Sequence, residues 1–372
     1  MGKWSELPSE IIHSISLRID NLFDLIHFRS VCSFWRSSSL LKVRRMPSLR
    51  CPLPLDSGGY GDDCHILRSR VYRVNFSNRD NSPRYWLFKL REKENGDIIL
   101  HGLFRREHPS VYGWLSPNFT LDLINCQVLE LAQDHVACYT SWFEPFESVG
   151  KQEGFIGFMS LDAENNEFMI LGKLSFNRPA AYRSINGRWT ELEITPNGHL
   201  EAILSYKNKF YAIDRTGITI VVEPTLEVST WSRPCDKTRL RWLVKSGDKV
   251  LLVEMCTESW SDFRIPNIRE KKIWFEISEL DEENNNWIQV EDIDGRVLFL
   301  EQFCSISCLV TEIQGFRANS IIFMDLWGVN NTSKHEGILV YEFNEQGVRS
   351  LADIPEYVEL FPSPPGWIVS NG

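Results

Sequence analysis

The spacing of apolar residues divides this chain into a short helical beginning and a long β-rich remainder. Leu7, Ile11 and Ile15 recur every fourth residue, which is the period of an amphipathic helix. Pro8 suits the first turn of that helix, and Asn21 can cap a second one. The second apolar face follows in Leu22, Leu25, Ile26, Phe28 and Val31. With "CSFWR" as a third short helix, the pattern predicts a three-helix unit at residues 1–46.

From Val71 onward apolar and polar positions alternate, as is typical of strands. One unit recurs: an aromatic-led strand, a turn rich in Asn, Gly or acidic residues, and a second strand. Gly and Asn supply the left-handed backbone conformations that hairpin turns require. Copies of this unit are "YWLFKLREKENGDIILHG", "GFMSLDAENNEFMILG", "KFYAIDRTGITIVVE", "WFEISELDEENNNWIQVE" and "LVYEFNEQGVRSL", with a degenerate copy in "LDLINCQVLEL".

Repeated hairpins with hardly any helix favour a β-propeller, so the predicted fold is mainly β with a small helical head. At about 50 residues per blade, the span 70–372 accommodates about six blades. Irregular spacing leaves seven blades as an alternative, and a large β-sandwich is another. The predicted domains are the helical unit at 1–46, a linker at 47–69 and the propeller at 70–372.

Charge and targeting signals limit the partners of the chain. Residues 1–50 carry eight Lys/Arg and four Asp/Glu, a net of +4, so the rest of a chain of net charge −10 carries −14. A large acidic domain is a poor nucleic-acid binder, because phosphates require a basic face. We find no signal peptide and no apolar run long enough to span a membrane. Without a secretory signal, the nine scattered cysteines are expected to be reduced thiols. We therefore expect no nucleic acid, no membrane, and a location in the nucleus or cytoplasm.

The helical unit holds more large apolar side chains than so small a core can bury, which indicates a partner surface. Its sequence, "WSELPSEIIHSISLRI…NLFDLIHFRSVCSFWRSS", resembles the F-box in the Leu7-Pro8 start, the spaced Ile residues and the Val31-Cys32-x-x-Trp35-Arg36 ending. In that family the motif binds a groove on a Skp-type adaptor, which is attached to a cullin in a ubiquitin ligase. The resemblance implies that the adaptor contacts Leu7, Pro8, Ile11, Ile15, Leu22, Leu25, Val31, Cys32, Trp35 and Arg36. The alternative is a cap that covers one end of the β domain.

The β region has a resemblance of its own. "KFYAIDRTGITIVVEP", "DKVLLVEM", "VEDIDGRVLFLEQFCSIS" and "PSPPGWI" are similar to the C-terminal domain of a large plant F-box family of the SKIP type. That domain is known as domain of unknown function 295 and is regarded as a kelch-like propeller. Where relatives often have an N-P-x-T-G turn, this chain has Asn125-Cys126-Gln127, so we expect a distorted early blade.

Motifs for catalysis are missing. The sequence has no P-loop, no G-x-S-x-G and no H-E-x-x-H, and its cysteines and histidines match no metal-ligand spacing. We therefore predict no catalytic residues, no metal and no cofactor. Aromatic side chains in turns are candidates for binding a protein substrate, since Trp is a preferred interface anchor. The candidates are Trp142, Phe143, Trp260, Phe263, Arg264 and Trp327; the alternative is that they pack between blades.

These features predict the substrate-recognition subunit of a Skp–cullin–F-box ubiquitin ligase. Such a subunit performs no chemistry and acts through proximity, by holding a substrate near the conjugating enzyme. One alternative is an F-box protein that works outside a ligase as a scaffold or inhibitor. Another is a propeller hydrolase with paired carboxylates in its central channel.

Overall fold

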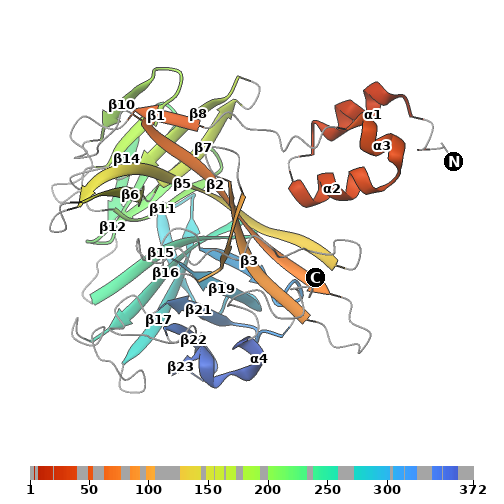
Figure 1. The fold of residues 1–372 in the computed structure, drawn as a ribbon. Helices are drawn as coiled ribbons and strands as arrows, with labels where there is room; N and C mark the ends of the chain where they lie inside the picture. Colours follow the sequence, from red (N-terminus) through yellow and green to blue (C-terminus); the bar gives the residue numbers. More distant parts are fainter. Residues whose placement is uncertain are drawn as a thin grey trace.

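The computed structural model describes most of the chain in separate stretches. These are residues 4, 7–19, 21–39, 49–52, 63–76, 84–92, 98–104, 126–143, 148–154, 156–162, 165–172, 179–192, 200–232, 238–258, 272–301, 305–313, 315–324, 337–345 and 347–358. A helical head lies beside a larger β body, and the two are linked through β1 (Figure 1). No helix in these stretches is long and apolar enough to cross a membrane.

Three short helices form the head: α1 (Ser9–Ser16), α2 (Leu22–Ser30) and α3 (Ser33–Ser38). Pro8 precedes α1 at its N-cap position. The predicted capping role of Asn21 is confirmed, because its side chain accepts a 2.9 Å hydrogen bond from the backbone N–H of Phe23. Cys32 caps α3 in a similar way, with its Sγ 3.4 Å from the N of Trp35.

The body consists of five mostly antiparallel sheets, here written from edge to edge. The first is β4 (Ile98–Gly102), β3 (Arg84–Glu92), β2 (Asp63–Phe76), β5 (Cys126–Phe143) and β6 (Ser148–Gly154), with β1 (Leu49–Pro52) paired to β2. The second is β10 (Arg188–Glu191), β9 (Ala180–Arg183), β8 (Glu167–Gly172) and β7 (Ile156–Asp162). The third is β11 (Leu200–Tyr206), β12 (Lys209–Asp214), β13 (Ile218–Val222) and β14 (Val228–Ser232).

The remaining two sheets complete the body. The fourth is β15 (Thr238–Ser246), β16 (Lys249–Thr257), β17 (Ile273–Asp281) and β18 (Asn286–Val290). The fifth is β20 (Ile306–Leu309), β19 (Arg296–Leu300), β21 (Ser320–Met324), β22 (Ile338–Glu342) and β23 (Gly347–Ser350), in which β19 and β21 are parallel. A short 3-10 turn, η4 (Leu351–Asp353), and α4 (Pro355–Val358) follow.

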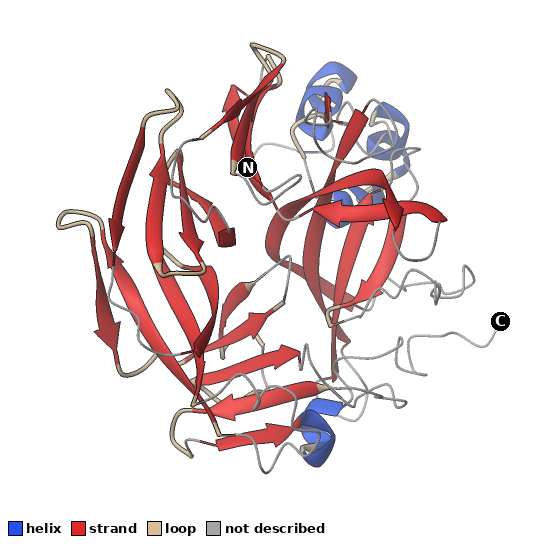
Figure 2. Ribbon diagram, turned by 90° about the vertical axis from the view of Figure 1, so that its left-hand side faces the viewer, coloured by secondary structure: helices blue, strands red, loops and turns tan. Residues whose placement is uncertain are grey.

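One strand of each sheet lies at the centre of the body. β5, β7, β11, β15 and β20 contact one another in that order, and β20 contacts β5 again, so the ring is closed. Figure 2 shows the sheets arranged around this centre. The described residues therefore form a β-propeller of five blades, which confirms the predicted class and rules out a sandwich of two stacked sheets.

The prediction of about six blades was wrong, and seven blades find no support in the described residues. The reason lies in the first sheet, whose β2 and β5 are 14 and 18 residues long. Val71 near the middle of β2 packs with the fifth blade, whereas Ile66 near its start packs with the second. One long bent sheet thus contacts both neighbours, and its register shifts between Val71 and Tyr72. The "LDLINCQVLEL" copy is not a hairpin in its described part, since Cys126–Leu131 lies within β5.

The five complete hairpin copies were predicted correctly. They form β3–β4, β7–β8, β12–β13, β17–β18 and β22–β23. Asn166 and Asn285 adopt positive φ values of 54° and 50° in two of the turns, and Gly217 adopts 87° in a third. These are the left-handed conformations that Asn and Gly tolerate best.

The C-terminal segment closes the ring onto the first blade. Tyr357 of α4 is fully buried in one cluster with Val71 and Leu87 of the first sheet. Its ring lies 4.7 Å from that of Phe316, and its hydroxyl accepts a 2.7 Å hydrogen bond from the N–H of Arg317. This packing joins the first and last blades, and residues 359–372 lie outside the described part.

Candidate functional site

The helical head has a small internal core. Trp35 of α3 is 8% exposed and packs on Phe28 of α2, with ring centroids 4.5 Å apart. Leu25 of α2 and Ile12 of α1 are also buried. These side chains hold the three helices together, and several other apolar residues of the head are exposed.

The outward face of the head is strongly apolar. Of the ten large apolar residues that are exposed in the described part of the chain, five belong to residues 4–34. They are Trp4 (71% exposed), Ile11 (46%), Leu17 (43%), Val31 (61%) and Phe34 (43%). Single exposed apolar residues are normal, but five within so short a segment indicate a surface that another molecule covers.

The residues predicted to contact an adaptor divide into three groups. Pro8, Ile11, Val31 and Arg36 are exposed, and Leu7, Ile15 and Cys32 are half-buried. Leu25 and Trp35 are buried within the head, where they support the helices that carry the exposed residues. The backbone of Leu22 begins α2, while its side chain lies outside the described residues. Periodicity alone missed Trp4, Leu17 and Phe34 as exposed members of this face.

The head is joined to the propeller by a contact that the sequence did not reveal. Phe23 of α2 is 5% exposed, and its ring lies edge-on 4.9 Å from Tyr72 and 6.2 Å from Phe88. Asn21 Nδ2 donates a 3.0 Å hydrogen bond to Oε2 of Glu130, which also accepts a 3.2 Å hydrogen bond from Arg70 Nη1. One aromatic anchor and one polar contact therefore fix α2 against the first blade.

Replacing Phe23 with alanine should release the head from the propeller. The side chain is buried between two bodies, so its loss should weaken their contact by about 3 kcal/mol. We expect small-angle X-ray scattering to show a larger radius of gyration for the variant. Phe34→Ala is the matched control, because Phe34 is an exposed head phenylalanine. Equal scattering profiles for the two variants would contradict the role of this joint.

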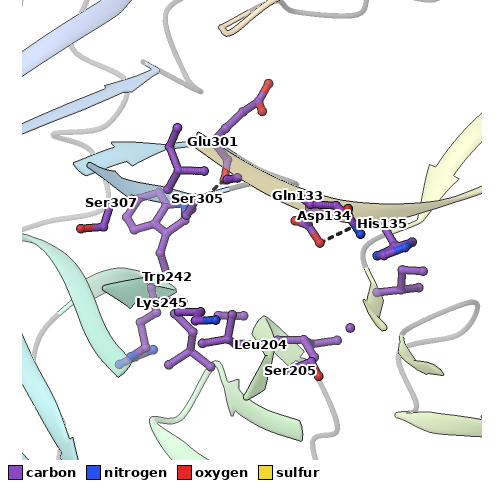
Figure 3. A pocket seen from close by; sticks show the side chains of 18 of the residues that line it. Gln133, Asp134, His135, Leu204, Ser205, Trp242, Lys245, Glu301, Ser305 and Ser307 are labelled. Carbon is purple, nitrogen blue, oxygen red and sulfur yellow. Dashed lines mark hydrogen bonds between the residues drawn. The ribbon is translucent and has the colours of Figure 1, made fainter. Parts of the chain in front are cut away.

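A cavity of about 850 Å³ lies on the axis of the propeller. All five central strands line it, through residues such as Asp134 of β5, Phe158 of β7, Ser205 of β11, Trp242 of β15 and Ser307 of β20. Figure 3 shows Trp242, Lys245 and Ser307 on one side and Gln133, Asp134 and His135 on the other. The wall combines aromatic, hydroxyl and charged side chains.

Two of the charged groups at the wall are neutralised by close partners. Arg241 Nη1 lies 3.0 Å from Oε2 of Glu201, and Lys89 forms an ion pair with Glu301. Burial raises the pKa of Glu201, with Arg241 acting in the opposite direction. These pairs hold neighbouring elements around the cavity.

Asp134 and His135 occupy the opposite side and have displaced pKa values. Burial raises the pKa of the Asp134 carboxyl to about 7, partly offset by the hydrogen bond that it accepts from the N–H of His135 (2.7 Å). Burial also lowers the pKa of His135 to about 3, and Arg68 and Arg70 lower it further. The imidazole stacks on Phe158 with ring centroids 3.9 Å apart. Around neutral pH this histidine is therefore an uncharged part of the wall.

Asp134→Asn should stabilise the protein by an amount that grows with pH. Between about pH 4 and pH 7 the folded wild type keeps a proton on Asp134 that the unfolded chain has lost, so its stability falls as pH rises. Asn removes this penalty, and the difference in unfolding free energy should grow by up to about 1.4 kcal/mol per pH unit in that range. Urea unfolding of both proteins across this range measures it. A difference that is constant with pH would contradict the prediction.

The side chains of the predicted substrate-binding residues lie outside the described part of the structure. Trp142 and Phe143 end β5, where their backbones pair with Val149 and Ser148 of β6, and their side chains lie outside the description. Trp260, Phe263, Arg264 and Trp327 lie outside the described residues altogether. Within the described part, no group of three or more His, Cys, Asp or Glu side chains could hold a metal ion.

Known proteins share both the propeller and the length of this chain. Residues 70–342 match the family described as KIB1-4 beta-propeller. "Putative F-box/kelch-repeat protein At5g24040" of Arabidopsis thaliana is 70% identical over 374 residues, which cover 100% of both chains. The chain is a member of the F-box/kelch-repeat proteins with a KIB1-4 β-propeller. The resemblance to a plant F-box family is confirmed at this level.

More distant relatives are aligned over most of this chain. "F-box protein SKIP23" of Arabidopsis thaliana is 24% identical and is aligned over 100% of this chain and 97% of its own. "F-box/kelch-repeat protein At1g64840" of the same plant is 26% identical, with coverage of 87% and 84%. The names of two of these relatives combine an F-box with kelch repeats, in agreement with a helical head and a propeller.

Proposed function

We propose that this F-box/kelch-repeat protein is the substrate-recognition subunit of a Skp–cullin–F-box ubiquitin ligase. Its head binds the Skp-type adaptor, and its propeller binds the protein to be ubiquitinated. The observation that carries the proposal is the set of exposed apolar side chains on the head, among them Ile11, Val31 and Phe34. Helical segments with apolar anchors are recognised by grooves on partner proteins.

The joint between head and propeller supports this division of labour. Phe23 and Asn21 hold α2 on the first blade, so an adaptor bound to the head has a set position relative to the propeller. A ligase subunit acts by keeping a substrate lysine near the conjugating enzyme, and a fixed joint raises that effective concentration. The F-box thus provides attachment and the propeller provides the choice of substrate.

Reconstitution tests the proposal directly. We expect the full-length chain to form a stable complex with a Skp-type adaptor and to bring a cullin into that complex. Proteins that accumulate on it when the proteasome is blocked should become ubiquitinated when this complex is supplied with the conjugating enzymes. Adaptor binding without any substrate turnover would favour a scaffold or inhibitor, and lack of adaptor binding would overturn the proposal.

A further inference from the structure

Two cations that line the axial cavity are not paired with the carboxylates that line it. Lys245 is the penultimate residue of β15 and Arg296 begins β19, and both line the cavity. No carboxylate of the described residues lies within ion-pair distance of either cation. Arg215 is a third lining cation, and its Nε reaches Glu201 only at 4.0 Å. Apart from Glu301 and Glu201, which are paired, the lining carboxylates are Asp134 and Glu312.

The position of Arg296 is fixed by its neighbours. Its Nη1 lies 3.4 Å from the hydroxyl of Ser307, and that hydroxyl is 2.9 Å from the hydroxyl of Ser246. A Cβ atom on Gly247 would lie 3.3 Å from Arg296 Nη2, so the glycine leaves room for the guanidinium at the end of β15. The hydroxyl of Ser307 and the guanidinium of Arg296 therefore lie together, next to the strand end that carries Lys245.

An apolar wall adjoins this cationic side. Trp242 lies on β15, the same strand as Lys245. Figure 3 places Trp242, Lys245 and Ser307 on one side of the cavity. Leu204 of β11 supplies a further apolar contact, while Phe158 of β7 lies with His135 on the opposite side. The cavity volume falls in the range of about 300–1,000 Å³ that is usual for small-molecule sites, which combine an apolar lining with few polar groups.

We propose that the axial cavity binds a small organic anion, in which a carboxylate or phosphate is attached to an aromatic or branched apolar body. The anionic group lies at Lys245, Arg296 and the Ser307 hydroxyl, where charge-assisted hydrogen bonds are available. The apolar body lies against Trp242. Four Lys or Arg side chains and four Asp or Glu side chains line the cavity, so the site depends on where the unpaired cations lie and not on an excess of positive charge. This site is independent of the head and goes beyond the proposed ligase role.

Calorimetric titration of the full-length chain tests the site, with benzoate, isovalerate and phenyl phosphate as probes. We expect at least one of them to bind once per chain, about tenfold or more tightly than benzyl alcohol or benzylammonium, which lack the negative charge. Inorganic phosphate, which lacks the apolar body, should bind more weakly than phenyl phosphate. Equal binding of benzyl alcohol, or failure of all three anions to bind, would overturn the proposal.

Two variants locate the binding. Lys245→Gln should weaken binding of the anion by about tenfold, and Trp242→Ala should weaken it too. Lys249→Gln is the matched control: it removes the same charge from the same hairpin, at a lysine that pairs outside the cavity with Glu279 (3.0 Å) and Asp294 (3.2 Å). It should change the affinity by less than about twofold. If Lys249→Gln weakens binding as much as Lys245→Gln, the anion is held by overall charge and not in the cavity.

Discussion

Ile11→Glu combined with Val31→Glu should abolish binding of the Skp-type adaptor while the propeller stays folded. The two side chains are 46% and 61% exposed, so their replacement removes little internal packing. In a complex, however, each glutamate would lie in an apolar groove without a partner for its charge. We expect the affinity to fall by more than about 100-fold, which corresponds to about 3 kcal/mol or more.

A matched control exists on the propeller. Ile185 and Ile288 are 58% and 53% exposed, and both lie far from the head in sequence. Ile185→Glu with Ile288→Glu introduces the same two charges at similar exposure and should leave adaptor binding unchanged. Binding is measured by surface plasmon resonance on immobilised adaptor, and folding by circular dichroism. Wild-type affinity in the head variant, or equal loss in the control, would contradict the assignment of this face.

Local structure was predictable because its causes are local. The hairpins around Asn166 and Asn285 follow from turn chemistry and alternating patterns within a few residues. The blade count depends instead on long-range pairing. Nothing within the sequences of β2 or β5 indicates that the first sheet packs against two different blades. Ile66 packs with the second blade and Val71 with the fifth, and the register shift follows Val71.

The candidate sites were predictable to different extents. The apolar surplus of the head was visible in its composition, but helical period did not tell which side chains would fill the core. Trp35 turns inward onto Phe28, while Phe34, the preceding residue, turns outward. The axial cavity gave no signal in the sequence, since its wall is built from five strands that lie far apart along the chain. Lys245 and Ser307 line the same cavity because β15 and β20 lie side by side in the closed ring.

A buried charge cluster between the third and fourth blades provides the second large effect. Glu254 of β16 is 3% exposed and accepts hydrogen bonds from Arg239 and Arg241 of β15. Arg239 also lies 3.0 Å from Glu276 of β17, and Arg241 lies 3.0 Å from Glu201 of β11. The cluster thus connects two blades, and Glu254 is the carboxylate shared by both guanidinium groups.

Glu254→Gln should lower the free energy of unfolding by about 3–5 kcal/mol. Removing one partner of a buried ion pair leaves the other charge in a medium that solvates it poorly, and here two arginines lose the same carboxylate. Glu279→Gln is the matched control, because Glu279 on the adjacent strand pairs with Lys249 at the surface, where ion pairs contribute up to about 1 kcal/mol. Urea unfolding followed by tryptophan fluorescence measures both variants. Losses of similar size would show that the buried cluster stabilises the fold no more than an exposed pair does, because its gain in attraction is offset by the cost of desolvating its five charged side chains.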